Sequence, residues 1–241
     1  MKDVTLESLR EGSILTFDKP MYWTSFDLVN KVRRVITLAS GGKKVKVGHA
    51  GTLDPLATGL MIVCTGRETK RIALMTDLDK EYIAVFRLGS TTPSHDLETE
   101  TDATYPTEHI TEEMIGSVIA GMHGEQVQVP PVFSAKLIDG KRAYELARMG
   151  IMKEPKPVKV MIREMELLGI NSNDVTVRVL CSKGTYIRSL ARDFGIALGS
   201  GAHLVSLTRT MIGEYRLGDA VTPENFEKFV ILLKQSASES V

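Results

Sequence analysis

Asp54 lies in a glycine-rich run that could hold a carboxylate in a fixed orientation. The run reads Gly48-His49-Ala50-Gly51-Thr52-Leu53-Asp54-Pro55-Leu56-Ala57-Thr58-Gly59. Its glycines permit unusual backbone angles or a close approach to a ligand, and Pro55 favours an extended conformation of Asp54. A carboxylate held in this way can act as a nucleophile. The same spacing fits a purely structural turn, and no Gly-Lys-Ser/Thr follows that would make a phosphate-binding loop.

Two other stretches carry groups that could assist a carboxylate. Cys181-Ser182-Lys183-Gly184-Thr185-Tyr186-Ile187-Arg188 runs from a strand through a turn into a helix. Arg188 could pair with a carboxylate and keep it ionised, or it could lie on a solvent-facing helix surface. In Asp79-Lys80-Glu81-Tyr82, the tyrosine could pack in the core or stack on a base. The histidines at 95, 109, 123 and 203 form no metal-ligand set, so we expect no metal and no cofactor.

The elements that must position these groups follow from periodicity and capping residues. We expect strands at 13–18, 60–64, 81–89, 158–170 and 175–181, with a turn at 171–174. We expect helices from Thr24 or Ser25 to Gly41-Gly42, and at 67–75, 111–122, 144–149, 187–198 and 223–234. The stretch 90–107 is predicted to form loops. Strands and helices mix without strict alternation, which favours an α+β fold with a mixed, mostly antiparallel sheet flanked by helices and loops. We expect a single catalytic domain over 1–241, with a core at about 12–220 and a C-terminal helix and tail at 221–241.

The composition is ordinary for a soluble globular protein, with 43% hydrophobic and 25% charged residues in 241. Thirty basic and thirty acidic side chains cancel, which alone disfavours nucleic-acid binding. The charges are uneven, however, because basic residues gather at 31–46 and 136–159 while 77–113 is mostly acidic. Such a basic face could bind RNA, or it could be ordinary solvated surface.

Compartment and membrane association can also be predicted from the sequence. Cys64 and Cys181 lie in apolar stretches, which predicts buried free thiols in a reducing cytoplasm. The charged N-terminus lacks the apolar core of a signal peptide, and no apolar run reaches the roughly 20 residues of a membrane span. We therefore expect a cytoplasmic protein that binds no membrane.

Taken together, these motifs resemble the TruB family of pseudouridine synthases. The Asp54 run matches the stretch around the family's catalytic aspartate. Further matches follow in order: Asp18-Lys19-Pro20, Asp79-Lys80-Glu81-Tyr82, Pro130-Pro131-Val132-Phe133-Ser134-Ala135-Lys136, Gly140-Lys141-Arg142-Ala143-Tyr144-Glu145, Lys183-Gly184-Thr185-Tyr186-Ile187-Arg188, and Gly201-Ala202-His203 leading to Leu207. One motif would be weak evidence, but this ordered series spans residues 14 to about 215.

The resemblance implies a pseudouridine synthase fold and an isomerase that converts uridine 55 in the T-loop of tRNA to pseudouridine. It implies Asp54 as the nucleophile, which could attack C1′ of the ribose or C6 of the uracil, or assist glycal formation. It also implies that Arg188 pairs with Asp54, that Tyr82 stacks on the flipped uracil, and that Tyr186 and Leu207 line the pocket. His49 would fill the gap left by flipped nucleotides, while Lys19 and Lys136 are weaker candidates for RNA contacts. We expect a monomer that needs no guide RNA.

Two departures from the family pattern bear on RNA binding. Many members carry glycine at the position of Tyr22, and we expect the bulky pair Tyr22-Trp23 to pack in the core rather than to extend an RNA contact. Many members also continue into a small PUA-like RNA-binding domain, which we do not expect here. Two other functions remain open: an inactive RNA-binding protein on the same scaffold, and a nucleoside or glycoside hydrolase. The hydrolase is disfavoured because no second carboxylate is evident as its acid.

Overall fold

The structure, a computed structural model, describes residues 4–134, 136–138, 140–151 and 153–239. The chain forms two compact units. Met1–Leu78 and Thr208–Val241 form the first, and Asp79–Leu207 form the second. We call them the Asp54 unit and the Arg188 unit. Strand β12 (Ala202–Ile212) contributes residues to both.

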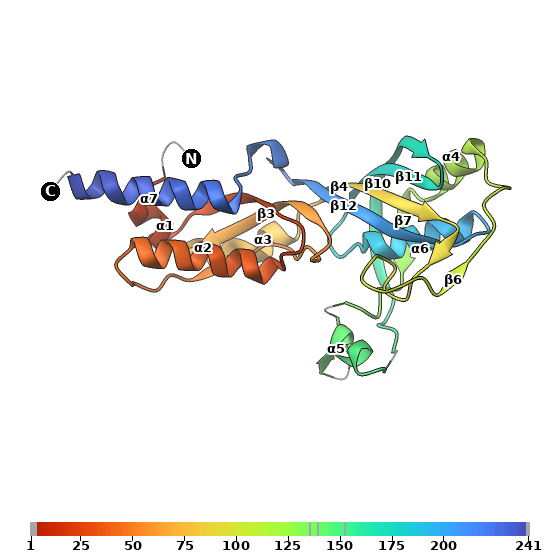
Figure 1. The fold of residues 1–241 in the computed structure, drawn as a ribbon, viewed down its shortest axis with the longest axis horizontal. Helices are drawn as coiled ribbons and strands as arrows, with labels where there is room; N and C mark the ends of the chain where they lie inside the picture. The colour runs from red at the N-terminus through yellow and green to blue at the C-terminus, as the bar shows by residue number, and fades with distance from the viewer. Residues whose placement is uncertain (1–3, 135, 139, 152, 240–241) are drawn as a thin grey trace. The chain divides into compact units, whose positions relative to one another are not determined.

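The Asp54 unit is a small sheet covered by helices. Its elements are α1 (Leu6–Glu11), β1 (Ile14–Lys19), α2 (Ser25–Ala39), β2 (Val47–His49), β3 (Thr58–Thr65), the 3₁₀ helix η1 (Gly66–Arg71), α3 (Ile72–Thr76), the end of β12, β13 (Tyr215–Arg216), the 3₁₀ helix η2 (Leu217–Asp219) and α7 (Pro223–Glu239). Strand β3 is the centre, because β1 and β2 pair with it antiparallel and β12 pairs with it in parallel. Helices α2 and α7 run side by side (Figure 1), and the Phe17 and Phe226 rings meet edge to face at 5.1 Å.

The Arg188 unit is built on longer antiparallel strands. Its elements are β4 (Lys80–Leu88), β5 (Ser90–Thr91), β6 (Ala103–Thr104), α4 (Glu112–Gly121), β7 (Gly124–Gln128), β8 (Leu137–Ile138), β9 (Lys141–Arg142), α5 (Ala143–Arg148), β10 (Val158–Asn171), β11 (Asp174–Cys181), α6 (Ile187–Ala197) and the start of β12. Strands β4, β11, β10 and β7 lie next to one another in that order, all antiparallel. Burial alternates strictly along β11, as expected for a strand with one face in the core. Phe194 of α6 packs on Phe86 of β4 with ring centroids 5.5 Å apart.

The α+β arrangement with a mostly antiparallel sheet is confirmed. Of the two predicted caps of α2, Thr24 and Ser25, the structure has Thr24. Its hydroxyl accepts a hydrogen bond from the Asp27 amide at 3.0 Å, while the Asp27 carboxylate accepts from the Thr24 amide at 2.9 Å. Thr111 caps α4 as predicted. The expected helix at 67–75 begins instead as the 3₁₀ helix η1, and the expected loop at 90–107 contains the short β5–β6 hairpin.

The two cysteines are free and buried, as predicted. Within the described residues, no helix is long and apolar enough to cross a membrane. The expectation for Tyr22 is wrong, because its side chain is 75% exposed and lies outside the core. Trp23 beside it is only partly buried.

Candidate active site

The Asp54 loop joins β2 to β3 and is held by hydrogen bonds on both sides of the aspartate. The buried Ser25 hydroxyl accepts from the Leu53 amide at 2.8 Å and donates to the Leu53 carbonyl at 2.9 Å. The Ala57 amide donates to the Asp54 carbonyl at 3.1 Å, which closes a turn. Leu53 and Ala57 are buried, whereas Asp54 is partly exposed. The loop therefore anchors its apolar side chains in the core and leaves the carboxylate accessible to a substrate.

Arg209 of β12 holds this loop by hydrogen bonds to its backbone, and no sequence motif marks this residue. Its side chain is 1% exposed. Its Nε donates to the Leu60 carbonyl at 2.7 Å, and its two terminal nitrogens donate to the carbonyls of Thr52 and Gly51 at 3.3 and 3.2 Å. Gly59 has φ +101°, and a Cβ there would lie 2.4 Å from the Arg209 carbonyl. The glycine therefore allows the close approach between β3 and β12 that brings Arg209 to the loop.

Lys19 is fully buried at the end of β1, in the same unit. Its Nζ donates to the Pro20 carbonyl at 2.9 Å and to the Trp23 carbonyl at 2.7 Å. Burial lowers the pKa of Lys19 to about 8, although the negative charge of Asp54 opposes that shift. This placement argues against the phosphate contact suggested for Lys19. Its ammonium instead supplies positive charge to the Asp54 loop from the protein side.

His49 ends β2 and is partly buried. Burial is the main cause that lowers the pKa of His49, and the Arg209 charge adds to it. Both effects favour the neutral imidazole, which suits a side chain that inserts between bases rather than one that binds phosphate. No three His, Cys, Asp or Glu side chains gather as a metal-ion site in the part of the chain that the structure describes.

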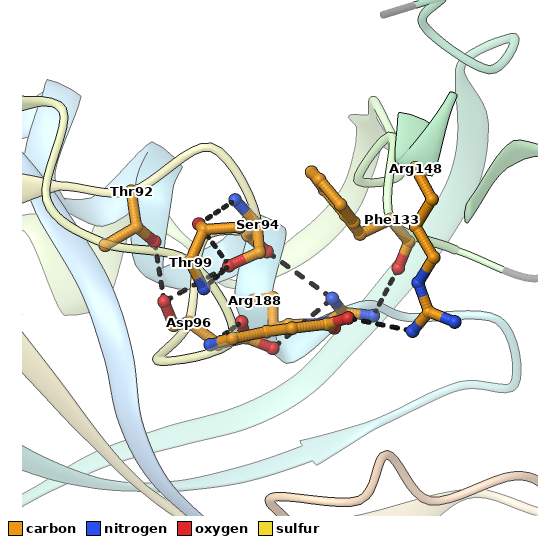
Figure 2. Close-up of polar contacts among 8 residues, drawn as sticks. Thr92, Ser94, Asp96, Thr99, Phe133, Arg148 and Arg188 are labelled. Atoms are coloured by element: carbon orange, nitrogen blue, oxygen red, sulfur yellow. Dashed lines mark hydrogen bonds and ion pairs between the residues drawn. The ribbon is translucent and has the colours of Figure 1, made fainter. Parts of the chain in front are cut away.

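Arg188, in the first turn of α6, has an acidic partner that the sequence analysis missed (Figure 2). Its guanidinium lies 3.3 Å from the Asp96 carboxylate, and both side chains are almost fully buried. It also donates to the carbonyls of Phe133 at 3.0 Å and Ser94 at 3.4 Å. The alternative of a solvent-facing arginine is therefore wrong. Asp96 had no distinguishing signal, because it lies in a polar stretch predicted as loop.

The Asp96 turn is itself closely hydrogen-bonded. The other oxygen of the Asp96 carboxylate accepts from the Glu98 amide at 2.9 Å, and the Thr92 hydroxyl donates to the Asp96 carbonyl at 2.7 Å. Ser94 and Thr99 join their hydroxyls at 2.8 Å across the turn, and Glu98 pairs with Arg148 of α5 at 3.1 Å (Figure 2). These bonds fix the carboxylate that faces Arg188, so they orient the guanidinium in turn.

Three further predicted site residues belong to the Arg188 unit. Tyr82 lies on β4 and is 8% exposed. The backbone of Tyr186 is held by the Gln128 side chain, which accepts from the Tyr186 amide at 2.8 Å and donates to its carbonyl at 3.0 Å. Leu207 on β12 is buried. The Arg188 unit thus contains Tyr82, Tyr186, Arg188 and Leu207, and the Asp54 unit contains Asp54 and His49. The pairing of Arg188 with Asp54 stays a prediction.

Lys136 also belongs to the Arg188 unit and directly precedes the β8–β9 hairpin. It lines a hollow of about 410 Å³ with Lys153, Glu154 and Lys156. Three ammonium groups against one carboxylate make this hollow a cationic surface, which is the character that phosphate binding requires.

Comparison with known proteins points to one family. A model of the TruB family pseudouridylate synthase N-terminal domain matches residues 37–187, and a model of the tRNA pseudouridylate synthase B C-terminal domain matches residues 188–241. The tRNA pseudouridine synthase B of Phocaeicola vulgatus is 56% identical over 223 residues, which is 92% of this chain and 95% of that protein. That of Parabacteroides distasonis is 58% identical over 219 residues, or 91% and 93% of the two chains.

Among solved structures, a chain of a Cbf5-Nop10-Gar1 complex is similar with a TM-score of 0.73 and 26% identity. The match covers 98% of this chain and 60% of that one, so this chain spans about three fifths of that protein's length. A chain of an H/ACA RNP bound to a substrate RNA, at 24% identity, has a TM-score of 0.70 over 96% of this chain and 57% of that chain. These likenesses confirm the predicted pseudouridine synthase fold.

Proposed function

We propose that this chain, which belongs to the TruB family of pseudouridylate synthases, isomerises uridine 55 in the T-loop of tRNA to pseudouridine with Asp54 as nucleophile. The observation that carries the proposal is the accessible carboxylate of Asp54 on a loop anchored by Ser25 and Arg209, in a chain more than half identical to proteins named tRNA pseudouridine synthase B.

The reaction breaks the bond between ribose C1′ and uracil N1, turns the base, and joins C1′ to C5. The C5 proton leaves and N1 gains a proton, so the product is an isomer and the step needs no oxidant or reductant. A carboxylate nucleophile can divide this change into two easier steps through a covalent intermediate. In the proposal, Arg188 keeps Asp54 ionised and oriented by ion pairing, and Asp96 keeps Arg188 in place.

The uridine must leave its stack to reach Asp54, at a cost of a few kcal/mol. Stacking on Tyr82 returns about 1–3 kcal/mol of that cost. Tyr186 and Leu207 line the uracil pocket, His49 fills the gap left by the flipped nucleotides, and Lys136 contacts RNA phosphate. We propose that the enzyme works as a monomer in the cytoplasm and without a guide RNA, because a T-loop already presents bases that can be splayed out.

The test is pseudouridine mapping of an unmodified tRNA transcript treated with the purified protein and no added RNA. We expect one new pseudouridine, at position 55. Asp54→Asn should abolish turnover and leave the dissociation constant for tRNA within a few-fold of the wild-type value. A wild-type protein that leaves every tRNA uridine unmodified would contradict the proposal.

Two substitutions distinguish the possible roles of Tyr82, stacking and proton transfer. If the ring only stacks on uracil, Tyr82→Phe retains substantial activity and Tyr82→Ala does not. If the hydroxyl moves a proton, both variants lose turnover while Tyr82→Phe still binds tRNA. Single-turnover rates on the same transcript separate the two outcomes.

A further inference from the structure

Tyr22 adopts a backbone conformation that a tyrosine rarely takes. Its φ is +68°, in the left-handed region that favours glycine. Such a residue normally persists because surrounding packing or function requires it. The side chain is 75% exposed, so burial of the ring does not compensate for the unfavourable backbone. The tyrosine at this position therefore calls for a reason that lies outside the protein core.

The backbone of this segment is fixed relative to the Asp54 loop. The Tyr22 amide donates to the Pro55 carbonyl at 2.7 Å, directly after Asp54. On the other side of Asp54, the Ser25 hydroxyl holds both the amide and the carbonyl of Leu53. Lys19 binds the Trp23 carbonyl from within. Two tethers that flank Asp54 therefore hold the Tyr22 backbone next to the Asp54 loop, in the same unit.

Other apolar side chains close to Tyr22 in the sequence are also exposed. Met21 is 43% exposed and Phe26, in the first turn of α2, is 60% exposed. The Arg33 guanidinium lies 5.9 Å from the centre of the Phe26 ring. We call Met21, Tyr22 and Phe26 the Tyr22 surface. Aromatic rings next to an arginine are the groups on which unpaired nucleic-acid bases stack, and single-stranded loops offer such bases.

We propose that Tyr22 stacks on an unpaired base of the substrate RNA, adjacent to the uridine on which Asp54 acts. The inference rests on the proposed function, since it takes the Asp54 loop as the substrate site. Its occupant is a nucleotide rather than a protein segment, because the Tyr22 backbone is hydrogen-bonded to that loop and a guanidinium lies over the Phe26 ring. The ring adds affinity and selects the conformation of the base next to the target.

The test compares Tyr22→Ala and Tyr22→Phe, each in an Asp54→Asn background that leaves the transcript unconverted. The matched control is Leu232→Ala, which removes an exposed apolar side chain of α7 in the same unit. Tyr22→Ala should raise the dissociation constant for the tRNA transcript by about 5- to 150-fold, the range for loss of one stacked base. Tyr22→Phe should stay within about twofold, and Leu232→Ala should match the parent.

Three readouts distinguish stacking from a structural role. Tyr22→Gly removes the backbone strain, so we expect its thermal stability to equal or exceed that of the wild type while its RNA affinity falls. Trp23 is the sole tryptophan, and its emission should change when tRNA binds. Transcripts with one abasic T-loop position should lose the Tyr22→Ala penalty at a single position next to the target uridine, which identifies the stacked base.

Several results would overturn the inference. One is a Tyr22→Ala variant that binds the tRNA transcript as tightly as its Asp54→Asn parent. Another is a Tyr22→Gly variant whose melting temperature and RNA affinity fall together. A third is Tyr22-dependent self-association with an unchanged RNA dissociation constant, which would make the surface a protein contact. A wild-type protein that binds tRNA through Tyr22 but forms no pseudouridine would support stacking and contradict the proposed function instead.

Discussion

The buried Arg188–Asp96 pair gives a prediction whose size can be worked from its geometry. Asp96→Asn keeps the side-chain oxygen that accepts from the Glu98 amide, but it removes the negative charge 3.3 Å from the guanidinium. Removal of one partner of a buried ion pair costs about 3–5 kcal/mol. Arg188 retains the carbonyls of Phe133 and Ser94, so we expect a smaller loss of stability than that range, about 2–3 kcal/mol.

The assay is thermal unfolding followed by circular dichroism, together with single-turnover kinetics on a tRNA transcript. In a chain of this length, about 1 kcal/mol corresponds to roughly 2–4 °C, so the melting temperature should fall by about 4–12 °C. The rate should fall by up to about 10²-fold, because small displacements of a positioning group have effects of that order. Tight binding of tRNA should persist.

A matched control comes from the same unit. Asp174 pairs with Arg87 at 2.7 Å, but both side chains are substantially exposed. Exposed pairs contribute about 0–1 kcal/mol, so Asp174→Asn should lower the melting temperature by less than about 4 °C and leave turnover unchanged. If Asp96→Asn loses no more stability than Asp174→Asn and modifies tRNA at the wild-type rate, then Asp96 does not position Arg188 and the reasoning is refuted.

Two further predictions concern the Asp54 loop. Arg209→Met leaves three carbonyls without their donor. It should cost roughly 3 kcal/mol of stability, at about 1 kcal/mol per bond, and lower the single-turnover rate. Arg209→Lys should recover part of the stability and part of the rate, and equal stability for the two variants would argue against the hydrogen-bond explanation. Burial lowers the pKa of Lys19 from 10.5 to about 8. Between about pH 8 and 10.5, the unfolded chain therefore keeps the Lys19 proton that the folded chain has lost. Because the unfolded state binds more protons there, the contribution of Lys19 to stability rises with pH across that range. Urea titrations across that range should give a stability difference between wild type and Lys19→Met that changes by up to about 3 kcal/mol, and a pH-independent difference would contradict the shifted pKa.

The elements that sequence could predict are those whose signal is local. Thr24 and Thr111 cap helices because a hydroxyl reaches amides two or three residues along the chain. The turn at Asn171–Asp174 joins two strands with alternating or continuous apolar patterns, so β10 and β11 were both predicted. Strand β2 was not predicted because it is only three residues long. Strands β7 and β12 were not predicted because they pair with strands far along the chain and carry little pattern of their own.

The same distinction between local and long-range signals applies to the residues of the candidate site. The Asp54 loop was recognisable because glycine and proline restrict the backbone where they stand. Asp96 and Arg209 were missed because their roles arise from contacts across long separations: Arg188 meets the Ser94 carbonyl 94 residues away, and Arg209 meets the Leu60 carbonyl 149 residues away. Neither residue lies in a motif, so only the folded chain identifies the partners that hold Arg188 and Asp54.

Tyr22 was misjudged for a different reason, and the error is informative. A bulky aromatic pair is usually buried, because burial of a ring is favourable. Here the hydrogen bond from the Tyr22 amide to the Pro55 carbonyl accompanies a left-handed backbone, and the ring lies in solvent. Tyr22 therefore has neither the backbone conformation that tyrosine prefers nor the buried ring that is usual for an aromatic residue, and its amide is bonded to the loop that carries Asp54. Natural sequences concentrate such conflicts at functional sites, so this conflict itself supports a binding role for the ring.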